Sequence, residues 1–305
     1  MEIPTMKLAQ IIHNPGSGDA EHNKDSLIAS VEKSGYKTHY ISTLNPMWEA
    51  SLDTNADMHI VAGGDGTVRK LAVKFLQESQ EHRQKPMLLL PLGTANNITR
   101  SLGTDHFSIE QQMKLENVND YDCGSISGLE KYDFFIESMG AGIFPELIVK
   151  MDEESREFDS AEEELKYTYK VLKDLVRTYE PAELSLEIDE ITMKGRFLMA
   201  ELMNIRFLGP NIELAPKASS ADSFLDLVLI HESSRDELLK YIESVENESP
   251  QHDILENIAQ VYPAKNVSFI NHNEKLHVDD HIVENPGARV NAEVSPGVFK
   301  VFSEV

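Results

Sequence analysis

The amino-acid sequence predicts an α/β protein with two domains: an N-terminal domain with a parallel sheet and a C-terminal domain built as an antiparallel β-sandwich. Two observations lead to this fold class. Strands alternate with helices up to about residue 125, and many short strands joined by turns follow. The length of 305 residues also fits two domains of roughly 100–200 residues each. We place the domains at residues 1–125 and 126–295, and expect the tail, residues 296–305, to pack back on the first domain.

The N-terminal half begins with repeated strand–loop–helix units. The segment "KLAQIIH", residues 7–13, predicts a strand that ends in the polar turn "NPGSG". Leu27, Ile28 and Val31 then follow at helical spacing. A second strand is expected at "KTHYIS", residues 37–42, a helical stretch after it, and a third strand at "MHIVA", residues 58–62.

The third strand leads into a glycine loop and another helix. Apolar residues after the loop recur at positions i, i+3, i+4, i+7 and i+8, which is one face of an amphipathic helix: Val68, Leu71, Ala72, Phe75 and Leu76. The nearly continuous apolar run "PMLLLPLG", residues 86–93, predicts a strand covered on both faces. Such alternation indicates a parallel sheet with helices on both sides.

The second half changes character after about Asp122. The segment "KYDFFIESMGAG", residues 131–142, is strand-like, and an acidic stretch precedes a long helix at residues 165–179. The segment "AELSLEIDEITMKG", residues 182–195, alternates, with Leu184, Leu186 and Ile188 on one face and polar residues on the other, and together with the short strands after it predicts an antiparallel sandwich. Ser234 and Glu237 predict a capping box at the start of one more helix.

Composition narrows the classes of function. The formal charge of −24 argues against binding of nucleic acid and against a broad electrostatic grip on anionic membranes. An anionic ligand must then be held by local backbone N–H groups or a few placed Arg and Lys side chains. The N-terminus has no pattern of a secretory signal, so we expect a cytoplasmic protein. We expect Cys123, the single cysteine, to be buried as a small hydrophobic residue.

The loop "GGDGT", Gly63 to Thr67, follows a parallel strand and opens a helix. Gly63, Gly64 and Gly66 would let the backbone approach a phosphate, because no Cβ is in the way. Thr67 would start the helix, whose first N–H groups face a ligand, and Asp65 could hold Mg²⁺ directly or through water. The alternative is a tight turn alone. A second glycine loop, residues 93–97, after the next strand favours the phosphate site.

Four motifs in order resemble the diacylglycerol kinase catalytic-domain family, which includes sphingosine kinases and bacterial lipid kinases. They are "NPGSG" at residues 14–18, "GGDGT" at 63–67, "PLGTANN" at 91–97 and "APKASSADSFLD" at 215–226. The resemblance covers nearly the whole chain. It implies a nucleotide domain followed by a β-sandwich-like domain, an active site in the cleft between them, and transfer of the γ-phosphate of ATP to a lipid hydroxyl with Mg²⁺.

The resemblance also implies roles for particular residues. The "GGDGT" loop would line the triphosphate, and Asn14, Thr43 and Thr94 would complete the nucleotide site. Arg100 matches an arginine near the phosphates, where a guanidinium stabilises the negative charge of the transferring group. A metal site would involve the segment from Ser219 to Phe224, with the Asp222 carboxylate and main-chain carbonyls as ligands to Mg²⁺.

The sequence departs from the family at the position of the catalytic base. The family has an Asp-Gly-Glu turn whose glutamate accepts the proton of the attacking hydroxyl, whereas this chain has Asp279, Asp280 and His281. A neutral imidazole can act as a base near pH 7, so we predict His281 as the base, aided by Asp279. The alternative is that the turn faces solvent and no longer acts as a base.

Other departures follow the glycine loops. Arg69 and Lys70 replace the common Asn-Glu pair, and they could either offer positive charge to the acceptor or pair with nearby acids. Asn97 stands in place of an aspartate, Ser223 in place of a glycine, and Asp19 in place of a basic residue.

These observations lead to one principal hypothesis and two alternatives. The principal hypothesis is an ATP- and Mg²⁺-dependent kinase whose acceptor is a lipid-like alcohol such as diacylglycerol or a sphingoid base. The alternatives are a nucleotide-binding pseudokinase with a regulatory role and an NAD kinase. We expect at most transient contact with a membrane surface, and a homodimer is possible.

Overall fold

The computed structural model describes residues 6–18, 23–154, 158–181, 183–189, 191–270, 275–284 and 289–304. The chain divides into two compact units. Unit 1 comprises residues 1–121 and 297–305, and unit 2 comprises residues 122–296. Each unit has its own apolar core. Within the described residues, no helix is both long and apolar enough to cross a membrane.

Unit 1 is built on a parallel sheet with strand order β2-β1-β3-β4. These strands are β1 (Leu8–His13), β2 (Lys37–Ser42), β3 (Met58–Gly63) and β4 (Met87–Pro91). The end of β17 (Arg289–Phe302) adds a further parallel strand, because Val301 pairs with Met87 of β4. The last residues of the chain are therefore part of the N-terminal sheet.

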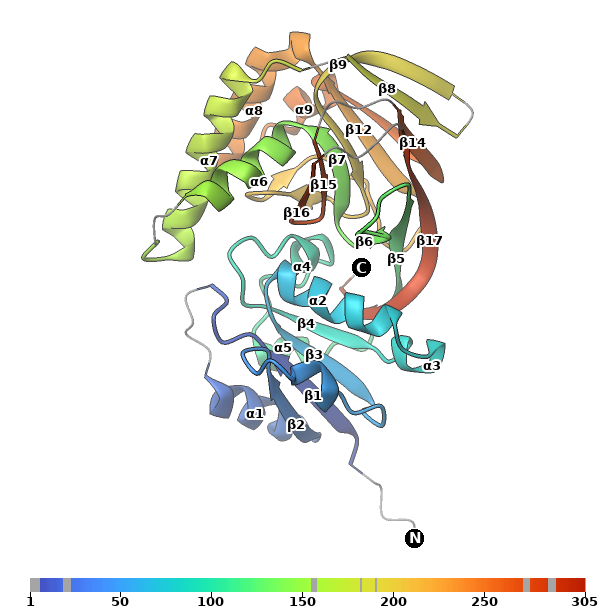
Figure 1. Cartoon of the computed structure of the whole chain (residues 1–305). Helices are drawn as coiled ribbons and strands as arrows, with labels where there is room; N and C mark the ends of the chain where they lie inside the picture. The colour runs from blue at the N-terminus through green and yellow to red at the C-terminus, as the bar shows by residue number, and fades with distance from the viewer. Residues whose placement is uncertain are drawn as a thin grey trace. The chain divides into compact units, whose positions relative to one another are not determined.

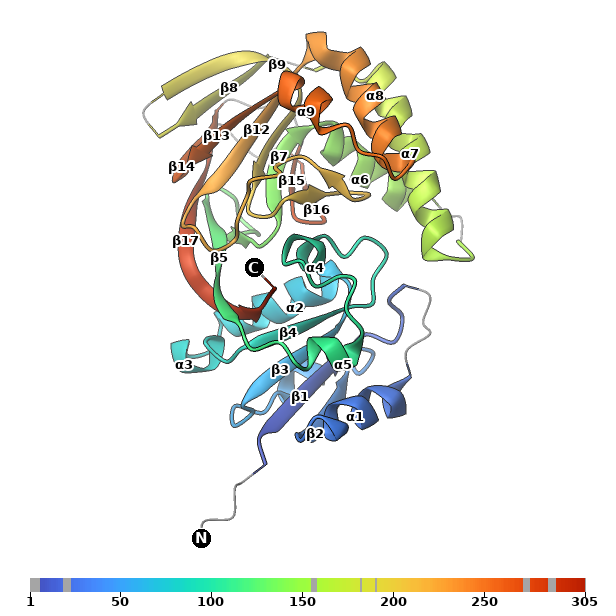
Figure 2. The ribbon, with the colours of Figure 1, turned by 180° about the vertical axis from the view of Figure 1, so that it is seen from behind.

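Helices cover both faces of the unit 1 sheet. One face packs against α1 (Lys24–Lys33) and α5 (Ile109–Gln112), and the other against α2 (Asp65–Leu76) and α3 (Gln80–Arg83) (Figures 1 and 2). Two short helices complete the unit, η1 (Trp48–Ser51) and α4 (Asn97–Ser101). The helical stretch expected between the second and third strands is thus only the single turn η1, since turns and bends occupy the rest of residues 43–57.

Unit 2 contains the β-sandwich. Strand β9 (Ile191–Met203) is long enough to take part in two sheets: its first half pairs with β8, and its second half pairs with β7 and β12. The other strands of these sheets are β5 (Val118–Ser127), β6 (Phe134–Phe135), β7 (Ser138–Gly142), β8 (Glu183–Ile188), β12 (Leu225–His231), β13 (Ala259–Ala264), β14 (Asn266–Ile270), β15 (Leu276–Val278) and β16 (His281–Val283). A separate two-stranded sheet is formed by β10 (Phe207–Leu208) and β11 (Ile212–Glu213).

Two apolar cores lie on opposite faces of the β7–β9–β12 sheet. One fills the sandwich and contains Leu186, Leu202 and Phe269. The other, with Met199, Met203 and other residues, lies under the helices. These helices are α6 (Ile143–Glu153), α7 (Ala161–Thr178), η2 (Glu232–Ser234), α8 (Arg235–Glu246) and α9 (His252–Ile258).

Helix starts in unit 2 differ in part from the sequence prediction. The acidic residues before the long helix lie in its first turn, because α7 begins at Ala161 after the N-cap Ser160. The predicted capping box of α8 is wrong: Ser234 is the N-cap residue but its side chain makes no capping hydrogen bond. A preceding 3-10 turn sets the entry to α8 instead, and His231 caps that turn by accepting from the Ser233 N–H.

Cys123 is buried, as the sequence predicted. Burial raises the pKa of its thiol well above the usual value, and the charges of Asp279 and Asp122 add to this. The thiol is therefore held in its neutral form.

Candidate active site

The "GGDGT" loop lies where β3 ends and α2 begins. Gly64 is the N-cap residue of α2, and its carbonyl accepts from the backbone N–H groups of Thr67 and Val68. Thr67 is buried, and its hydroxyl accepts from Asn14 Nδ2 at 3.4 Å. The loop is thus fixed to the end of β1 as well as to its own helix.

The two glycine loops of unit 1 touch at their backbones. A Cβ on Gly64 would lie 2.9 Å from Gly93 Cα, and a Cβ on Gly93 would overlap Gly64. Asn96, with φ of 55°, closes the second loop by accepting from Gly93 N at 2.8 Å and donating to Gly93 O. Side chains are therefore excluded at both positions, and two stretches of bare backbone lie side by side.

Asp65 connects these loops through its carboxylate. Its Oδ2 accepts from the Asn97 backbone N–H at 2.8 Å, and its Oδ1 accepts from the Ile98 N–H at 3.0 Å. The first two N–H groups of α4 are therefore engaged by Asp65, as in an N-cap. A carboxylate oxygen can take part in more than one contact, so these two hydrogen bonds do not exclude Asp65 as a ligand of Mg²⁺ through water.

The "NPGSG" turn and Thr43 follow the two remaining strands. Asn14 N donates to Ala62 O of β3, and Thr43 N donates to His13 O of β1. Gly18, with φ of 55°, approaches β4, because a Cβ there would lie 2.7 Å from Leu92 O. The loops after β1, β3 and β4 are thus packed together. Asp19, noted from the sequence, lies outside the described residues.

This group of loops lies at the topological switch point of the sheet. From β1 the chain goes outward to β2, and then returns past β1 to β3 on the other side. Loops after β1 and β3 therefore diverge, and in open parallel sheets ligands bind at such a point, outside the carboxyl ends of the strands. Gly66 and Thr94 are both partly exposed at this edge.

The arginines near the loops have distinct environments. Arg100 lies on α4, and its guanidinium is 3.6 Å from Asp105 with 39% of the side chain exposed. Arg69 is on α2 and is buried, with 7% exposed, whereas Lys70 beside it is exposed. Arg100 is therefore partly exposed beside the loops, whereas Arg69 is buried in unit 1.

The "VDDH" turn of unit 2 connects β15 to β16. Asp279 has φ of 51°, is only 5% exposed, and its Oδ1 accepts from the N–H groups of Ile136, Glu137 and Ser138 at 2.8–3.3 Å. Such contacts satisfy the carboxylate with backbone donors. Asp279 therefore anchors the turn, and its oxygens are directed to backbone rather than to a neighbouring imidazole.

His281 is partly exposed at the end of this turn. Its side chain is 41% exposed, and Nδ1 lies 3.1 Å from Asp280 Oδ1. The Tyr132 ring lies 5.5 Å from the imidazole, centroid to centroid. Asp280, rather than Asp279, is the partner of His281.

The predicted metal segment forms a tight loop before β12. Asp222 Oδ1 accepts from the Phe224 N–H at 3.0 Å, and Ser219 Oγ accepts from the Ala221 N–H at 3.3 Å. Ser223 has φ of 65°, and its N–H donates to Asp122 Oδ2 at 2.7 Å. The described residues contain no group of three or more His, Cys, Asp or Glu side chains that could hold a metal ion. A cation here would depend on Asp222 together with main-chain carbonyls.

Comparison with known proteins identifies the family. Residues 9–126 match the family model described as the diacylglycerol kinase catalytic domain. Residues 149–303 match the model described as the YegS C-terminal NAD kinase beta sandwich-like domain. The chain belongs to the diacylglycerol kinase and YegS-like lipid kinase family.

Individual relatives of this lipid kinase family are distant in sequence. A diacylglycerol kinase of Bacillus subtilis (strain 168) is 26% identical over 247 residues, which cover 77% of each chain. A diacylglycerol kinase of Staphylococcus saprophyticus is 25% identical over 242 residues, covering 76% of this chain and 75% of the relative. A probable lipid kinase YegS-like of Shewanella frigidimarina is 25% identical over 177 residues, covering 58% and 55%.

Solved structures show the same fold. A putative diacylglycerol kinase from Bacillus anthracis str. Sterne superposes with a TM-score of 0.73 at 17% identity, covering 100% of this chain and 98% of the other. A second structure from that organism gives a TM-score of 0.70 at 17% identity, covering 99% of each chain. The predicted fold class, an N-terminal parallel-sheet domain followed by a β-sandwich-like domain, is confirmed.

The structure of this lipid kinase family member also reveals a pair that sequence reasoning missed. His277 on β15 and Glu201 on β9 are fully buried, with His277 Nε2 2.6 Å from Glu201 Oε2. Burial raises the pKa of Glu201, and the attraction of His277 opposes this. Glu201 interrupts the apolar segment "RFLMAELM", and that acid inside a buried strand was the available signal.

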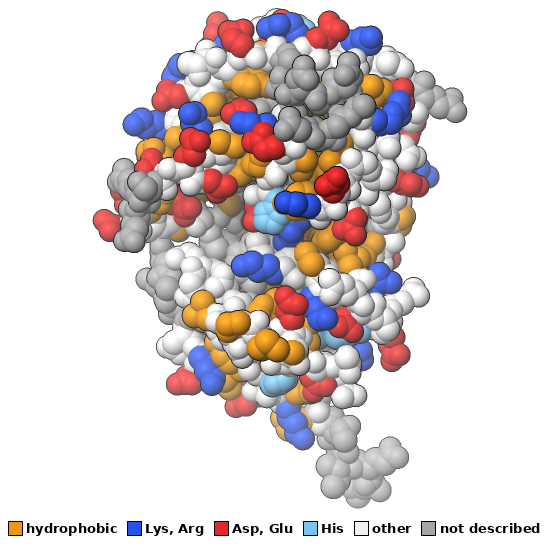
Figure 3. Space-filling model, viewed as in Figure 1, with side chains coloured by type: hydrophobic (Ala, Val, Ile, Leu, Met, Phe, Trp, Pro, Cys, Tyr) orange, Lys and Arg blue, Asp and Glu red, His pale blue; other side chains and the backbone are white. Residues whose placement is uncertain are grey.

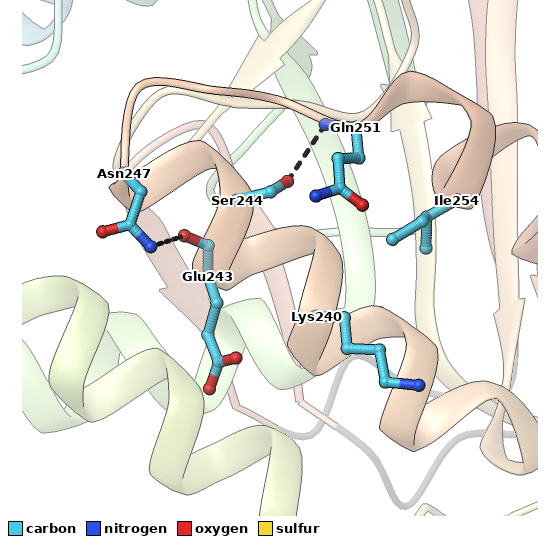
Figure 4. A pocket seen from close by; sticks show the side chains of 6 residues that line it. All are labelled: Lys240, Glu243, Ser244, Asn247, Gln251 and Ile254. Atoms are coloured by element: carbon cyan, nitrogen blue, oxygen red, sulfur yellow. Dashed lines mark hydrogen bonds between the residues drawn. The ribbon is translucent and has the colours of Figure 1, made fainter.

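A pocket of about 350 Å³ lies elsewhere in unit 2, beside the turn between α8 and α9 (Figure 4). Ser244 Oγ accepts from the Gln251 N–H at 3.0 Å, which ties the turn to α8. The pocket is lined by Lys240, Glu243, Ser244, Asn247, Gln251 and Ile254. These residues offer neither a glycine loop nor a cluster of cations, so the pocket lacks the groups that bind a triphosphate.

Proposed function

We propose that the protein is an ATP-dependent kinase that transfers the γ-phosphate to a hydroxyl of a lipid, with diacylglycerol as the first candidate. Membership of the lipid kinase family supports a kinase, and relatives about a quarter identical are named diacylglycerol kinases. The observation that carries the proposal is the contact of Gly64 with Gly93 at the switch point of the unit 1 sheet.

The unit 1 loops are suited to a triphosphate. Gly63, Gly64 and Gly93 let the loops pack closely at this edge, because a Cβ would meet Thr67 at Gly63 and the other loop at Gly64 and Gly93. The start of α2, a helix of 12 residues, points its first N–H groups to the same edge. On the face shown in Figure 3, Asp and Glu side chains are interspersed with Lys and Arg. The net charge of −24 therefore does not form one acidic patch on that face, and an anion can be held locally.

We assign the chemistry to residues of both units. Asn14, Thr43, Thr67 and Thr94 would bind and orient ATP, and Arg100 would neutralise charge on the γ-phosphate. His281 would accept the proton of the lipid hydroxyl while its oxygen bonds to the γ-phosphorus and the bond to the β–γ bridging oxygen breaks, which releases ADP.

Magnesium fits two places in this proposal. Asp65 would hold it near the phosphates through water, and Ser219, Asp222 and Phe224 would hold a second ion with one carboxylate and main-chain oxygens. When bound near the phosphates, Mg²⁺ supplies positive charge that stabilises the transition state.

The test is an assay of the purified protein with Mg²⁺, ATP and a panel of diacylglycerols, sphingoid bases and long-chain alcohols in mixed micelles. A phosphorylated lipid in the presence of one of these acceptors is the expected result. NAD is included in the panel, so that formation of NADP with no lipid product would identify an NAD kinase instead.

A nucleotide-binding protein without turnover is the second candidate, and His281 in place of the usual glutamate favours it. His281→Glu restores the carboxylate of the family. If the wild-type protein is inactive and this variant phosphorylates a lipid, the second candidate is correct. If the wild-type protein is active and His281→Ala is not, the kinase proposal is correct.

A further inference from the structure

A buried acid–imidazole pair lies across three strands of unit 2. Glu201 on β9 and His277 on β15 both face Gly140, the residue between them on β7. A Cβ on Gly140 would overlap the Glu201 carboxylate. The glycine therefore makes room for a hydrogen bond of 2.6 Å that passes over its own strand.

The proton positions in this pair follow from its neighbours. His277 Nδ1 lies 2.9 Å from Asp279 O, and a carbonyl can only accept, so Nδ1 carries a hydrogen. One further proton lies between Nε2 and the Glu201 carboxylate. Although burial alone lowers the pKa of His277, the charge and hydrogen bond of Glu201 raise it overall. The pair thus keeps both hydrogen bonds and no net charge.

The stability of the fold does not explain why Glu201 and His277 are buried at this place. Its neighbours on the same face include the apolar residues Met199, Met203 and Val228. Glu201 Oε1 has no hydrogen-bond partner among the described residues. Apolar side chains of similar volume are often at least as stabilising as a buried ionisable pair, so a role other than packing is indicated.

The pair is connected to the turn that carries His281. Asp279 N donates to Ser138 O, the Asp279 carboxylate accepts from residues 136–138, and the Asp279 carbonyl accepts from His277. The last contact holds the peptide plane between Asp279 and Asp280, and the pairing of Val278 with His281 holds the other end of the turn. We propose that Glu201 and His277 are positioning residues, which orient the Asp279 carbonyl and so hold His281 where it can accept the substrate proton. This inference rests on the proposed function.

Two replacements of His277 separate positioning from stability. In His277→Asn, the amide nitrogen lies near the former Nδ1, so it can donate to Asp279 O but cannot reach Glu201. In His277→Gln, the amide lies near the former Nε2, so it pairs with Glu201 but leaves Asp279 O without its donor. We expect His277→Gln to be more stable than His277→Asn, because His277→Asn leaves the buried acid Glu201 without its partner and this is the costlier defect.

Activity should follow the opposite order. We expect kcat of His277→Asn to stay within about threefold of wild type, and kcat of His277→Gln to fall about tenfold or more, since misplacing a base by a fraction of an ångström costs this much. The KM for ATP should not change in either variant. If kcat follows stability instead, with His277→Gln both more stable and more active, the proposal is overturned.

A readout without activity keeps this test independent of the proposed function. The ring resonance of His281, identified by its loss in His281→Ala, should shift in His277→Gln and remain near the wild-type position in His277→Asn. Equal spectra for both variants would overturn the positioning role even if the protein phosphorylates lipids. A shift only in His277→Gln would support it even if no lipid on the panel is phosphorylated.

Discussion

Replacing Asp65 by alanine removes the acceptor of two backbone N–H groups at the start of α4, at 2.8 and 3.0 Å. Loss of an N-cap acceptor costs about 0.5–2 kcal/mol, and hydrogen bonds to a charged group contribute about 1.5–3 kcal/mol each. Asn97 and Ile98, which donate them, are buried, so water replaces the carboxylate only in part. We therefore expect Asp65→Ala to lower the free energy of unfolding by about 2–4 kcal/mol.

Urea unfolding at pH 7 measures this loss, with Asp65→Asn and Asp105→Ala as comparisons. Asp65→Asn keeps one carbonyl oxygen and should lose about half as much. Asp105→Ala removes a partly exposed ion pair with Arg100 and should cost at most about 1 kcal/mol. A loss below about 0.5 kcal/mol in Asp65→Ala would refute the capping role. A loss of about 2–4 kcal/mol in Asp65→Ala would mean that the substitution destabilises the fold. Inactivity of this variant would then not by itself demonstrate that Asp65 is a metal ligand.

Two further predictions concern unit 1. Burial first, and then the charge of His82, lower the pKa of His59 to about 3, so stability is complete above the unfolded-state value near 6.5 and is lost as the pH falls toward 3. Between pH 8 and pH 5, the wild-type protein should lose about 2 kcal/mol more unfolding free energy than His59→Leu. Equal losses in the two proteins, measured by urea unfolding at each pH, would contradict this. Gly93→Ala would press a methyl group against Gly64 and should abolish ATP binding in calorimetry. The control Gly16→Ala, where a Cβ would have only Asn14 Oδ1 nearby at 3.7 Å, should bind ATP with the wild-type affinity. Equal ATP affinities of the two variants would show that the glycine contact is not part of the site.

Much of the parallel sheet could be predicted because local patterns determine it. The strand at residues 37–42 coincides with β2, and the apolar spacing from Val68 to Leu76 lies within α2. The helix at Ile143–Glu153 was missed, since "GAGIFPELIVK" carries a proline and continues an apolar strand. Gly142, with φ of 110°, turns the chain from β7 into that helix, and only glycine adopts this conformation readily.

The roles of several candidate residues depend on distant partners and could not be predicted. Asp65 was identified as a metal-binding residue, but its partners are 32 and 33 residues away on a helix of only five residues. Asp279 binds backbone groups more than 140 residues earlier in the chain. No spacing rule brings such pairs together, because α2 and α4 follow different strands of unit 1 and β15 meets β7 only when the sandwich forms.

We propose that loops of unit 1 bind ATP and that His281 of unit 2 accepts the proton of a lipid hydroxyl. The most direct test compares the wild-type protein with His281→Ala in the transfer of label from [γ-³²P]ATP to diacylglycerol, with ATP affinity measured in parallel. We predict labelled lipid from the wild type and a rate at least about 100-fold lower from His281→Ala, with unchanged ATP affinity. Equal rates for the two proteins, or no labelled lipid from the wild type, would contradict the claim.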